Sequence, residues 1–199
     1  MATATERLVE LVWLSPDAID LILTAEYKTA QELLDVTFPA DWPTHADLRF
    51  LRMKRTQMEG DPASSEWLAR LVVLPGKRLI VGHAGFHGKP GTNCRSRKDA
   101  VEIGYTIFEP YRRRGYATDA ARQLVEWAGD RGVPRVYASV SPLNTASLGV
   151  VHKLGFQRIG RHWNGEGAEE LEFELELEPE EVSSRPRRRL PILGAWLKS

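Results

Sequence analysis

The stretch EPYRRRGYAT, at residues 109–118, decides the fold of this chain. Before it, the β-branched and aromatic residues of VEIGYTIF, at residues 101–108, predict a strand. After it, alanine, leucine and valine recur at helical spacing through residues 118–131, which predicts a helix. The first N–H groups of a helix have no partner inside the helix, and the helix dipole adds partial positive charge there. We therefore expect this basic turn to bind phosphate groups.

Gly115 and the arginines around it suit this use. Glycine allows a backbone geometry that a side chain would resist, and it lets an anion approach the main chain closely. Arginine brings a permanent charge and a planar group that binds two phosphate oxygens at once. Two common phosphate motifs are excluded, because no Lys-Ser or Lys-Thr follows Gly115 and no second glycine lies two residues from it. An arginine-rich surface turn before an ordinary helix is the alternative.

A second patterned stretch follows at residues 135–156. In its first part, RVYASV at residues 135–140, apolar and polar residues alternate, which predicts a strand. This strand leads into SPLNTASLGVVHKLGF. Asn144 precedes the short helix expected there, where it can cap the helix or bond an amide of a ligand. Gly155 fits the end of that helix. The two stretches together form one strand–helix–strand–helix–strand block.

In this order the two stretches resemble the GNAT acetyltransferase superfamily. Arg112, Gly115 and Ala117 form R-x-x-G-x-A, which resembles the superfamily's pyrophosphate-binding motif. Asn144 and Ser147 resemble its N-x-x-S, which precedes a short helix and the letters K-L-G-F. The block therefore looks like the part of a GNAT domain that binds the acetyl donor.

The resemblance covers roughly residues 68–177 and is closest to one branch. EIGY at residues 102–105 and GYATDA at residues 115–120 are similar to the ribosomal-protein N-terminal acetyltransferases, a branch that also contains enzymes acting on other amines. The implied fold belongs to the α/β class, more narrowly α+β. It has a mixed, mostly antiparallel sheet of about seven strands, about four flanking helices and splayed central strands. We expect strands at residues 7–14, 66–74, 78–86, 101–108, 135–140 and 169–177 and one that opens at Phe156, and helices at residues 18–27, 29–34, 45–58 and 118–131. The glutamates of the last strand should form a solvated face.

Acetyl-coenzyme A is the cosubstrate that the resemblance implies, and no residue spacing indicates a metal site. Its pantetheine arm would insert between the strand at residues 102–108 and the strand at Val136, where it would bond main-chain groups near Ile107. Its phosphates would lie over the turn. The expected cofactor-binding residues are Ile107, Arg112, Arg114, Gly115, Tyr116, Ala117, Thr118 and Asn144.

Acetyl transfer needs a neutral amine, whereas an alkylamine is mostly protonated at pH 7. Glu102 is the carboxylate best placed to act as a general base, because it lies on the strand expected beside the thioester. A glutamate that faces solvent or holds a loop is the alternative. His83 and His87 on the preceding hairpin could also line the acceptor site, although no pattern assigns them a role.

Many GNAT enzymes place a tyrosine acid seven residues after the asparagine, and this chain has Val151 there. Ser147 is the other candidate to protonate the leaving thiolate, as the resemblance to the branch implies, and helix packing or capping is its alternative role. The missing tyrosine also leaves open a second class of function. In that class the chain is a catalytically weak module that binds coenzyme A.

Composition and net charge limit the classes of partner that the chain can bind. The 199 residues include 27 Lys and Arg and 27 Asp and Glu, so the formal net charge is zero and gives no global field for nucleic acid or a membrane. No apolar run reaches the roughly 18 residues that cross a bilayer. Cys94 is the single cysteine and lies in a polar loop stretch, which excludes an intrachain disulfide and favours a reducing cytoplasm.

One acetyltransferase domain is expected over residues 1–178, followed by a basic and apolar tail at residues 179–199. Prolines and clustered like charges argue against packing of the tail in the core. Its arginines at residues 185–189 make only a weak case for nucleic acid, because nearby glutamates cancel much of their field. The expected partner is an amine acceptor, either a protein N-terminus or a small molecule, with no membrane partner, and a homodimer is a possible assembly.

Overall fold

A computed structural model describes residues 7–177 of the chain. Seven strands form one sheet in the order β1-β2-β3-β4-β5-β7-β6, and every neighbouring pair is antiparallel except β4 and β5. This confirms the mixed, mostly antiparallel sheet expected from the sequence. The strands are β1 (Glu10–Trp13), β2 (Arg70–Leu74), β3 (Leu79–Phe86), β4 (Ala100–Ile107), β5 (Arg135–Val140), β6 (Gln157–Trp163) and β7 (Glu169–Glu176). The tail expected at residues 179–199 lies outside the described residues.

Six α-helices flank the sheet in the described part of the chain, against about four expected. They are α1 (Pro16–Leu23), α2 (Tyr27–Leu34), α3 (His45–Gly60), α4 (Ser65–Leu68), α5 (Tyr116–Gly129) and α6 (Thr145–Lys153), with short 3₁₀ turns at η1 (Pro62–Ser64) and η2 (Glu109–Tyr111). One difference lies at residues 66–74, which were expected to be a single strand. The first part forms α4, and β2 begins only at Arg70. The apolar run WLARLVVL fits a buried helical turn as well as a strand, so hydrophobicity alone did not separate them.

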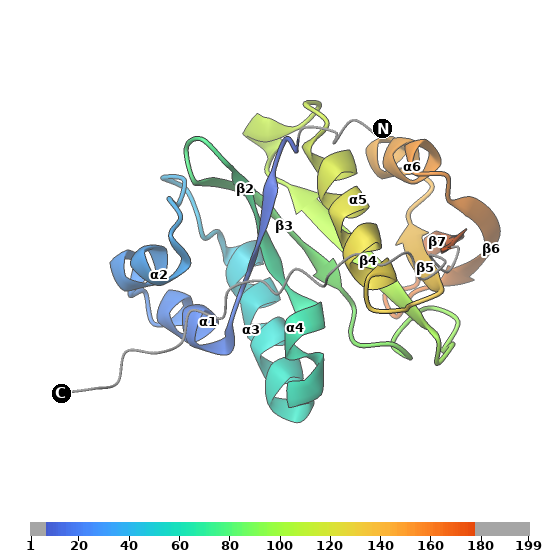
Figure 1. Cartoon of the computed structure of the whole chain (residues 1–199), viewed down its shortest axis with the longest axis horizontal. Helices are drawn as coiled ribbons and strands as arrows, with labels where there is room; N and C mark the ends of the chain where they lie inside the picture. The colour runs from blue at the N-terminus through green and yellow to red at the C-terminus, as the bar shows by residue number, and fades with distance from the viewer. Residues whose placement is uncertain (1–6, 178–199) are drawn as a thin grey trace, which may run out of the picture.

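The sheet separates two hydrophobic clusters. On one face Leu124 of α5 packs with Val81 and Ile103. On the other face Leu51 of α3 is buried with Ile80 and residues of α1 and α2. Adjacent residues of β3 thus point to opposite clusters, as the pleat of a strand requires. Figure 1 shows α5 running along the front of β4, with α1 and α2 at the opposite end of the molecule from α6.

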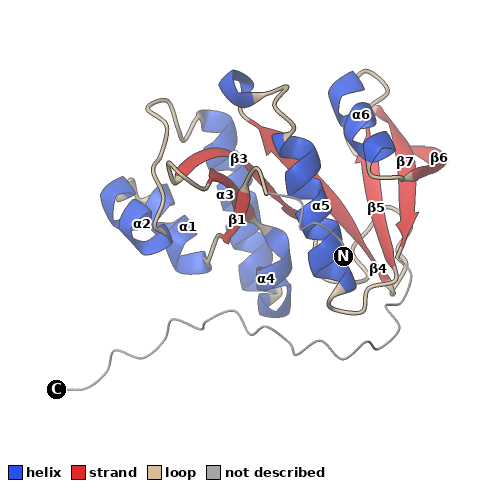
Figure 2. Ribbon diagram, turned by 45° about the horizontal axis from the view of Figure 1, so that its top comes forward, coloured by secondary structure: helices blue, strands red, loops and turns tan. Residues whose placement is uncertain are grey.

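β4 and β5 are the splayed central strands that the sequence predicted. They pair over three residues each, and the last pair is Glu102 with Tyr137. β4 continues to Ile107 and stays paired with β3 to that point, and β5 continues to Val140 paired with β7. The facing edges of the two strands therefore diverge beyond Glu102, as Figure 2 shows. Main-chain groups on these open edges need another hydrogen-bond partner.

Candidate active site

The turn between β4 and α5 leaves the N-terminus of α5 without a side-chain cap. Gly115 stands at the N-cap position with φ of 82°, a left-handed conformation that favours glycine. The first helical hydrogen bond joins the N–H of Asp119 to the carbonyl of Gly115. Within the described part of the chain, the N–H groups of Tyr116, Ala117 and Thr118 have no hydrogen-bond partner. Three free donors and the positive end of the helix dipole can together bind an anion.

The arginines at residues 112–114 are all exposed. Arg112 Nε donates to the carbonyl oxygen of Ile107 at 2.9 Å, and Arg114 Nη2 lies 3.4 Å from the carbonyl oxygen of Pro110. Among residues 7–177 none of the three forms an ion pair with a carboxylate, so their charge is not neutralised there. The carbonyl of Ile107, expected to lie near pantetheine, already accepts one hydrogen bond from Arg112.

Asp119 fixes the start of α5 against the N-terminal strand. Its buried carboxylate accepts hydrogen bonds from the N–H groups of Leu8, at 2.9 Å, and Val9, at 3.1 Å. Gln123 donates to the carbonyl of Val9 at 2.8 Å and so adds a second link. Asp119 was not predicted as a functional residue, although an acidic residue in the first turn of a helix is a usable signal. These contacts hold the turn in place relative to the sheet.

Asn144 and Ser147 lie together at the start of α6. Asn144 Oδ1 accepts a hydrogen bond from the N–H of Ser147 at 3.1 Å, so the capping role of Asn144 is present. Tyr105 on β4 donates its hydroxyl to the carbonyl oxygen of Ser147 at 3.4 Å, and burial raises the pKa of this tyrosine. No sequence pattern singled out Tyr105. Its position two residues from Ile103 and Ile107 puts all three on the α5 side of β4.

Glu102 lies on the other face of β4 and is buried, with 3% of its surface exposed. Its Oε2 accepts a hydrogen bond from the N–H of Cys94 at 2.6 Å, and its Oε1 lies 3.6 Å from Nδ1 of His87. The alternative of a solvent-facing glutamate is therefore wrong, whereas Glu102 does hold the loop that contains Cys94. Burial and the neighbouring charge of Glu102 raise the pKa of the Cys94 thiol to about 12. Such a thiol is a poor nucleophile at neutral pH.

A second buried carboxylate lies on the same face. Glu172 of β7 is 3% exposed, forms an ion pair with Arg95 and lies 3.1 Å from Nδ1 of His162. The expectation that all the glutamates of β7 face water is thus wrong for Glu172, because Arg95 reaches over from the loop after β3 to pair with it. Period-two alternation gives the face of a residue but cannot show which loop will cover that face. We call His87, Cys94, Arg95, Glu102 and Glu172 the Glu102 cluster.

The two faces carry different chemistry around the place where β4 and β5 diverge. Tyr105 and Ser147 lie on the α5 and α6 side, together with the uncapped end of α5. Glu102 and its cluster lie on the α3 side. An extended donor that passes between the open strand edges could therefore place its phosphates on one face and present its reactive group to the other.

Two basic side chains on the α3 side have lowered pKa values. His83 on β3 stacks on Phe50 of α3 with ring centroids 4.1 Å apart, and burial lowers the pKa of His83 to about 4. Lys54 is buried, donates to Gln57 at 3.1 Å, and has its pKa lowered to about 8 by burial. His83 is therefore uncharged at neutral pH and forms, with Phe50, an aromatic wall beside Thr106 of β4.

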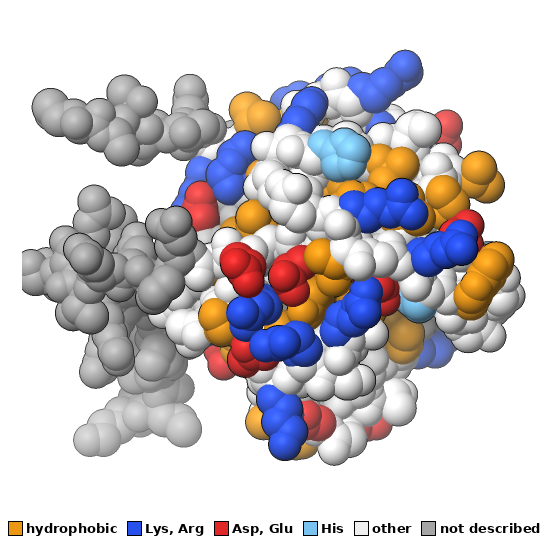
Figure 3. All heavy atoms as spheres, turned by 90° about the vertical axis from the view of Figure 1, so that its right-hand side faces the viewer, with side chains coloured by type: hydrophobic (Ala, Val, Ile, Leu, Met, Phe, Trp, Pro, Cys, Tyr) orange, Lys and Arg blue, Asp and Glu red, His pale blue; other side chains and the backbone are white. Residues whose placement is uncertain are grey.

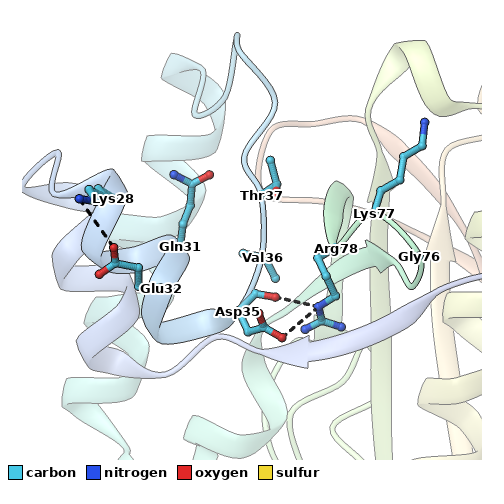
Figure 4. Close-up of a pocket in the computed structure, with 9 residues that line it drawn as sticks. All are labelled: Lys28, Gln31, Glu32, Asp35, Val36, Thr37, Gly76, Lys77 and Arg78. Atoms are coloured by element: carbon cyan, nitrogen blue, oxygen red, sulfur yellow. Dashed lines mark hydrogen bonds and ion pairs between the residues drawn. The ribbon is translucent and has the colours of Figure 1, made fainter.

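Figure 4 shows a separate hollow between α2 and the turn from β2 to β3. It has a volume of about 510 Å³. It is lined by Lys28, Gln31, Glu32, Asp35, Val36, Thr37, Gly76, Lys77 and Arg78. Several of its charged groups already pair with each other, Arg78 with Asp35 at 3.3 Å and Lys28 with Glu32 at 4.0 Å. None of the residues expected at the active site lines this hollow.

The surface and the helices restrict other functions. On the face shown in Figure 3, basic and acidic side chains are interspersed rather than segregated. A single-sign field of the kind that binds nucleic acid is not present on that visible face. In residues 7–177 no helix is long and apolar enough to cross a membrane. The same residues contain no group of three or more histidine, cysteine or acidic side chains placed to hold a metal ion.

Comparisons with known proteins agree with this geometry. Residues 9–157 match the family model described as an acetyltransferase (GNAT) domain. YjdG of Bacillus subtilis, described as an uncharacterised N-acetyltransferase, is 30% identical over 120 residues, which cover 58% of this chain and 67% of that protein.

Two solved structures show the same fold at low identity. Ribosomal-protein-S5-alanine acetyltransferase from Vibrio fischeri is 16% identical with a TM-score of 0.57, covering 88% of this chain and 97% of that chain. Microcin C7 self-immunity acetyltransferase MccE, solved in complex with acetyl-CoA and AMP, is 15% identical with a TM-score of 0.58, covering 87% of this chain and 94% of that chain.

Proposed function

Because this chain belongs to the GNAT acetyltransferase family, we propose that it moves an acetyl group from acetyl-CoA to a primary amine, which attacks the thioester directly in a ternary complex. The observation that carries the proposal is the uncapped N-terminus of α5 beside the open edge of β4. An anion site and a row of unpaired main-chain groups there match the two parts of coenzyme A, its phosphates and its amide-containing arm. The similar fold of MccE, solved with acetyl-CoA, supports the same donor.

In this proposal the phosphates bind the N–H groups at the start of α5 and the arginines of the turn. Gly115, Tyr116, Ala117 and Thr118 supply main-chain contacts, and Arg112 and Arg114 supply charge. The pantetheine arm follows the open edge of β4 near Ile107 and passes Asn144 at the start of α6. Main-chain N–H groups on the open edge would also stabilise the oxyanion that develops on the thioester.

The two catalytic roles fall on opposite faces of β4. Glu102 lies on the α3 side, and its negative charge promotes loss of the proton from the amine. Ser147 protonates the departing thiolate from the α6 side, where its main-chain carbonyl already holds Tyr105. Val151 occupies the position of the usual tyrosine acid, which leaves Ser147 as the hydroxyl of the N-x-x-S motif.

The acceptor approaches on the α3 side, where the Glu102 cluster and the Phe50–His83 wall lie. A protein N-terminus and a small-molecule amine both fit this description. The Vibrio fischeri protein of similar fold is named for a protein acceptor, the alanine of ribosomal protein S5. We further propose a cytoplasmic location, since the single cysteine leaves no intrachain disulfide.

The test is an acetyl-transfer screen. Purified protein is incubated with acetyl-CoA and panels of peptide N-termini, polyamines, aminoglycosides and small metabolic amines, and free coenzyme A thiol is measured with mass spectrometry of the products. We expect at least one class to consume thioester and gain an acetyl group. Binding of acetyl-CoA without transfer to any class would favour the second candidate, a catalytically weak coenzyme A-binding module, for which the missing tyrosine at Val151 is the motivating observation.

A further inference from the structure

His87 lies directly opposite Glu102 across the β3–β4 pair. Its N–H donates to the carbonyl oxygen of Glu102 at 2.9 Å, immediately after the last residue of β3. Residues that face each other across an antiparallel pair project their side chains to the same side of the sheet. The imidazole of His87 and the carboxylate of Glu102 therefore share the α3 side of β4, where the acceptor is proposed to approach.

The ring of His87 extends from Glu102 along β4 toward the diverging strands. Its Nδ1 is 3.6 Å from Glu102 Oε1, while its Nε2 lies 3.3 Å from the place that a Cβ at position 104 would take. Gly104 has no side chain, and this absence gives the ring room to lie over the strand. Gly104 also comes two residues after Glu102, the last β4 residue that pairs with β5. One ring nitrogen thus faces a carboxylate, and the other lies over Gly104.

The two side chains differ sharply in access. The side chain of Glu102 is 4% exposed and that of His87 is 51% exposed. Glu102 Oε2 is already bonded to the N–H of Cys94, which closes the approach from the loop. The half-exposed imidazole is therefore open to an incoming amine, whereas the loop at residues 87–99 covers Glu102.

We propose that His87 is the base that contacts the acceptor amine and that Glu102 acts through it. This rests on the proposed acetyl transfer. A carboxylate beside one nitrogen of an imidazole orients the ring and stabilises the imidazolium that forms when the other nitrogen takes a proton. The Nδ1–Oε1 separation of 3.6 Å is longer than a hydrogen bond, and contacts of this kind shorten when substrate binds.

The proton and electron balance is simple. The acceptor ammonium gives one proton to Nε2 of His87, and the imidazolium releases this proton to solvent. The amine lone pair then forms the C–N bond at the thioester carbonyl, and the C–S bond breaks with its electron pair on sulfur. The nitrogen loses its second proton, and the thiolate gains one. The products are the acetylamide, coenzyme A and one proton in solvent.

The other histidines near the sheet are less suited to this role. His83 is stacked on Phe50, and burial lowers its pKa to about 4, which makes it a weak base. His162 lies within 3.5 Å of both Glu170 and Glu172 at the β6–β7 pair. His87 combines a carboxylate at one nitrogen with an exposed ring.

The experiment compares His87→Gln, Glu102→Gln, the double variant and His45→Gln with wild type, using an amine found in the acceptor screen. His45 is exposed at the start of α3 and serves as the matched control. Because general-base catalysis contributes about 100- to 10,000-fold, we expect His87→Gln to lower kcat by about 100-fold or more. Affinity for acetyl-CoA should stay unchanged in every variant, and His45→Gln should keep wild-type turnover.

Two readouts separate a chemical role from a structural one. Imidazole added to the buffer should restore part of the turnover of His87→Gly, which leaves space for it, and should not restore Glu102→Gln. The double variant should be no slower than His87→Gln alone, since residues that act as a unit are not additive. Gly104→Ala, which keeps both side chains but crowds the ring, should show an intermediate loss.

Three outcomes would overturn the assignment. Wild-type kcat in His87→Gln together with a large loss in Glu102→Gln would mean that Glu102 takes the proton itself. Loss of turnover in His87→Gly without any rescue by imidazole, with a lowered melting temperature, would make His87 structural. An absence of acetyl transfer by the wild-type protein to every amine would instead remove the proposed function, and the assignment with it.

Discussion

The turn that begins α5 and the Glu102 cluster lie on opposite sides of β4 and are built in opposite ways. The turn is exposed, is continuous in sequence from Arg112 to Thr118, and offers mainly main-chain N–H groups. The Glu102 cluster brings side chains from β4, β7 and the loop at residues 87–99 to two buried carboxylates. A ligand common to a whole family can be bound by local main-chain geometry. Recognition of an individual acceptor depends on side chains that only the tertiary fold brings together.

If the two regions are functionally separate, Glu102→Gln should affect turnover and leave donor binding unchanged. The amide keeps the size of the side chain but cannot carry the negative charge, so we expect kcat to fall by about 100-fold. Steady-state kinetics with a competent amine gives kcat, and calorimetry gives the acetyl-CoA Kd. Glu169→Gln, which changes an ion-paired glutamate of β7 outside the Glu102 cluster, is the control and should keep most of the turnover. Full turnover in Glu102→Gln would reduce Glu102 to a residue that holds the loop.

Gly115→Val should give the reverse pattern, with weak donor binding. The β-branched side chain is strained at φ of 82°, and its Cβ would lie 3.2 Å from Leu8 Cδ1, so the turn must shift and its N–H groups lose their aim at the phosphates. We expect acetyl-CoA affinity to fall by roughly 30-fold, which corresponds to about 2 kcal/mol. Gly132→Val is the matched control, because Gly132 has φ of 74° with open space around its Cβ position, beyond the other end of α5. Both variants should lose stability because of the positive φ, but only the first should lose affinity. Equal affinities would place the phosphates elsewhere.

A smaller effect, on stability alone, is expected at Lys54 on the α3 side. Its pKa of about 8 in the folded protein lies below the ordinary lysine value of 10.5, so the unfolded chain binds more protons between these two values. The free energy of unfolding should therefore rise as the pH increases through this window. Lys54→Met should stabilise the protein at pH 7 by roughly 1–2 kcal/mol and should abolish that rise. Denaturant unfolding at pH 7 and pH 10 measures both effects, and a flat wild-type profile would contradict the assignment.

The smallest signal is the slow alkylation of Cys94. Its thiol pKa of about 12 leaves little thiolate at pH 8, so iodoacetamide should label the folded protein much more slowly than the unfolded chain. Because the charge of Glu102 contributes to that raised pKa, Glu102→Gln should label faster than wild type. Mass spectrometry over a time course gives both rates. Rapid labelling of folded wild type would mean that the loop opens readily and exposes the Glu102 cluster.

The sequence predicted those parts of the molecule whose signals are local. The seven strands and the positive-φ glycine at the start of α5 follow from short patterns of residues, whereas the splay of β4 and β5 was implied by the family resemblance. α4 was missed because a four-residue helix and a buried strand share the same apolar letters. The burial of Glu172 was missed because it depends on Arg95, which is 77 residues away along the chain. His87 was named as a residue that could line the acceptor site, but its place beside Glu102 was not predicted, because it depends on Gly104 across the β3–β4 pair.

The most direct test of the central claim is a crystal structure of the protein with acetyl-CoA. We expect pyrophosphate oxygens within hydrogen-bond distance of the N–H groups of Tyr116, Ala117 and Thr118. We also expect a pantetheine arm between the diverging edges of β4 and β5, with the thioester near the ring of His87. Acetyl-CoA bound away from the start of α5, for instance in the hollow between α2 and the β2–β3 turn, would contradict it.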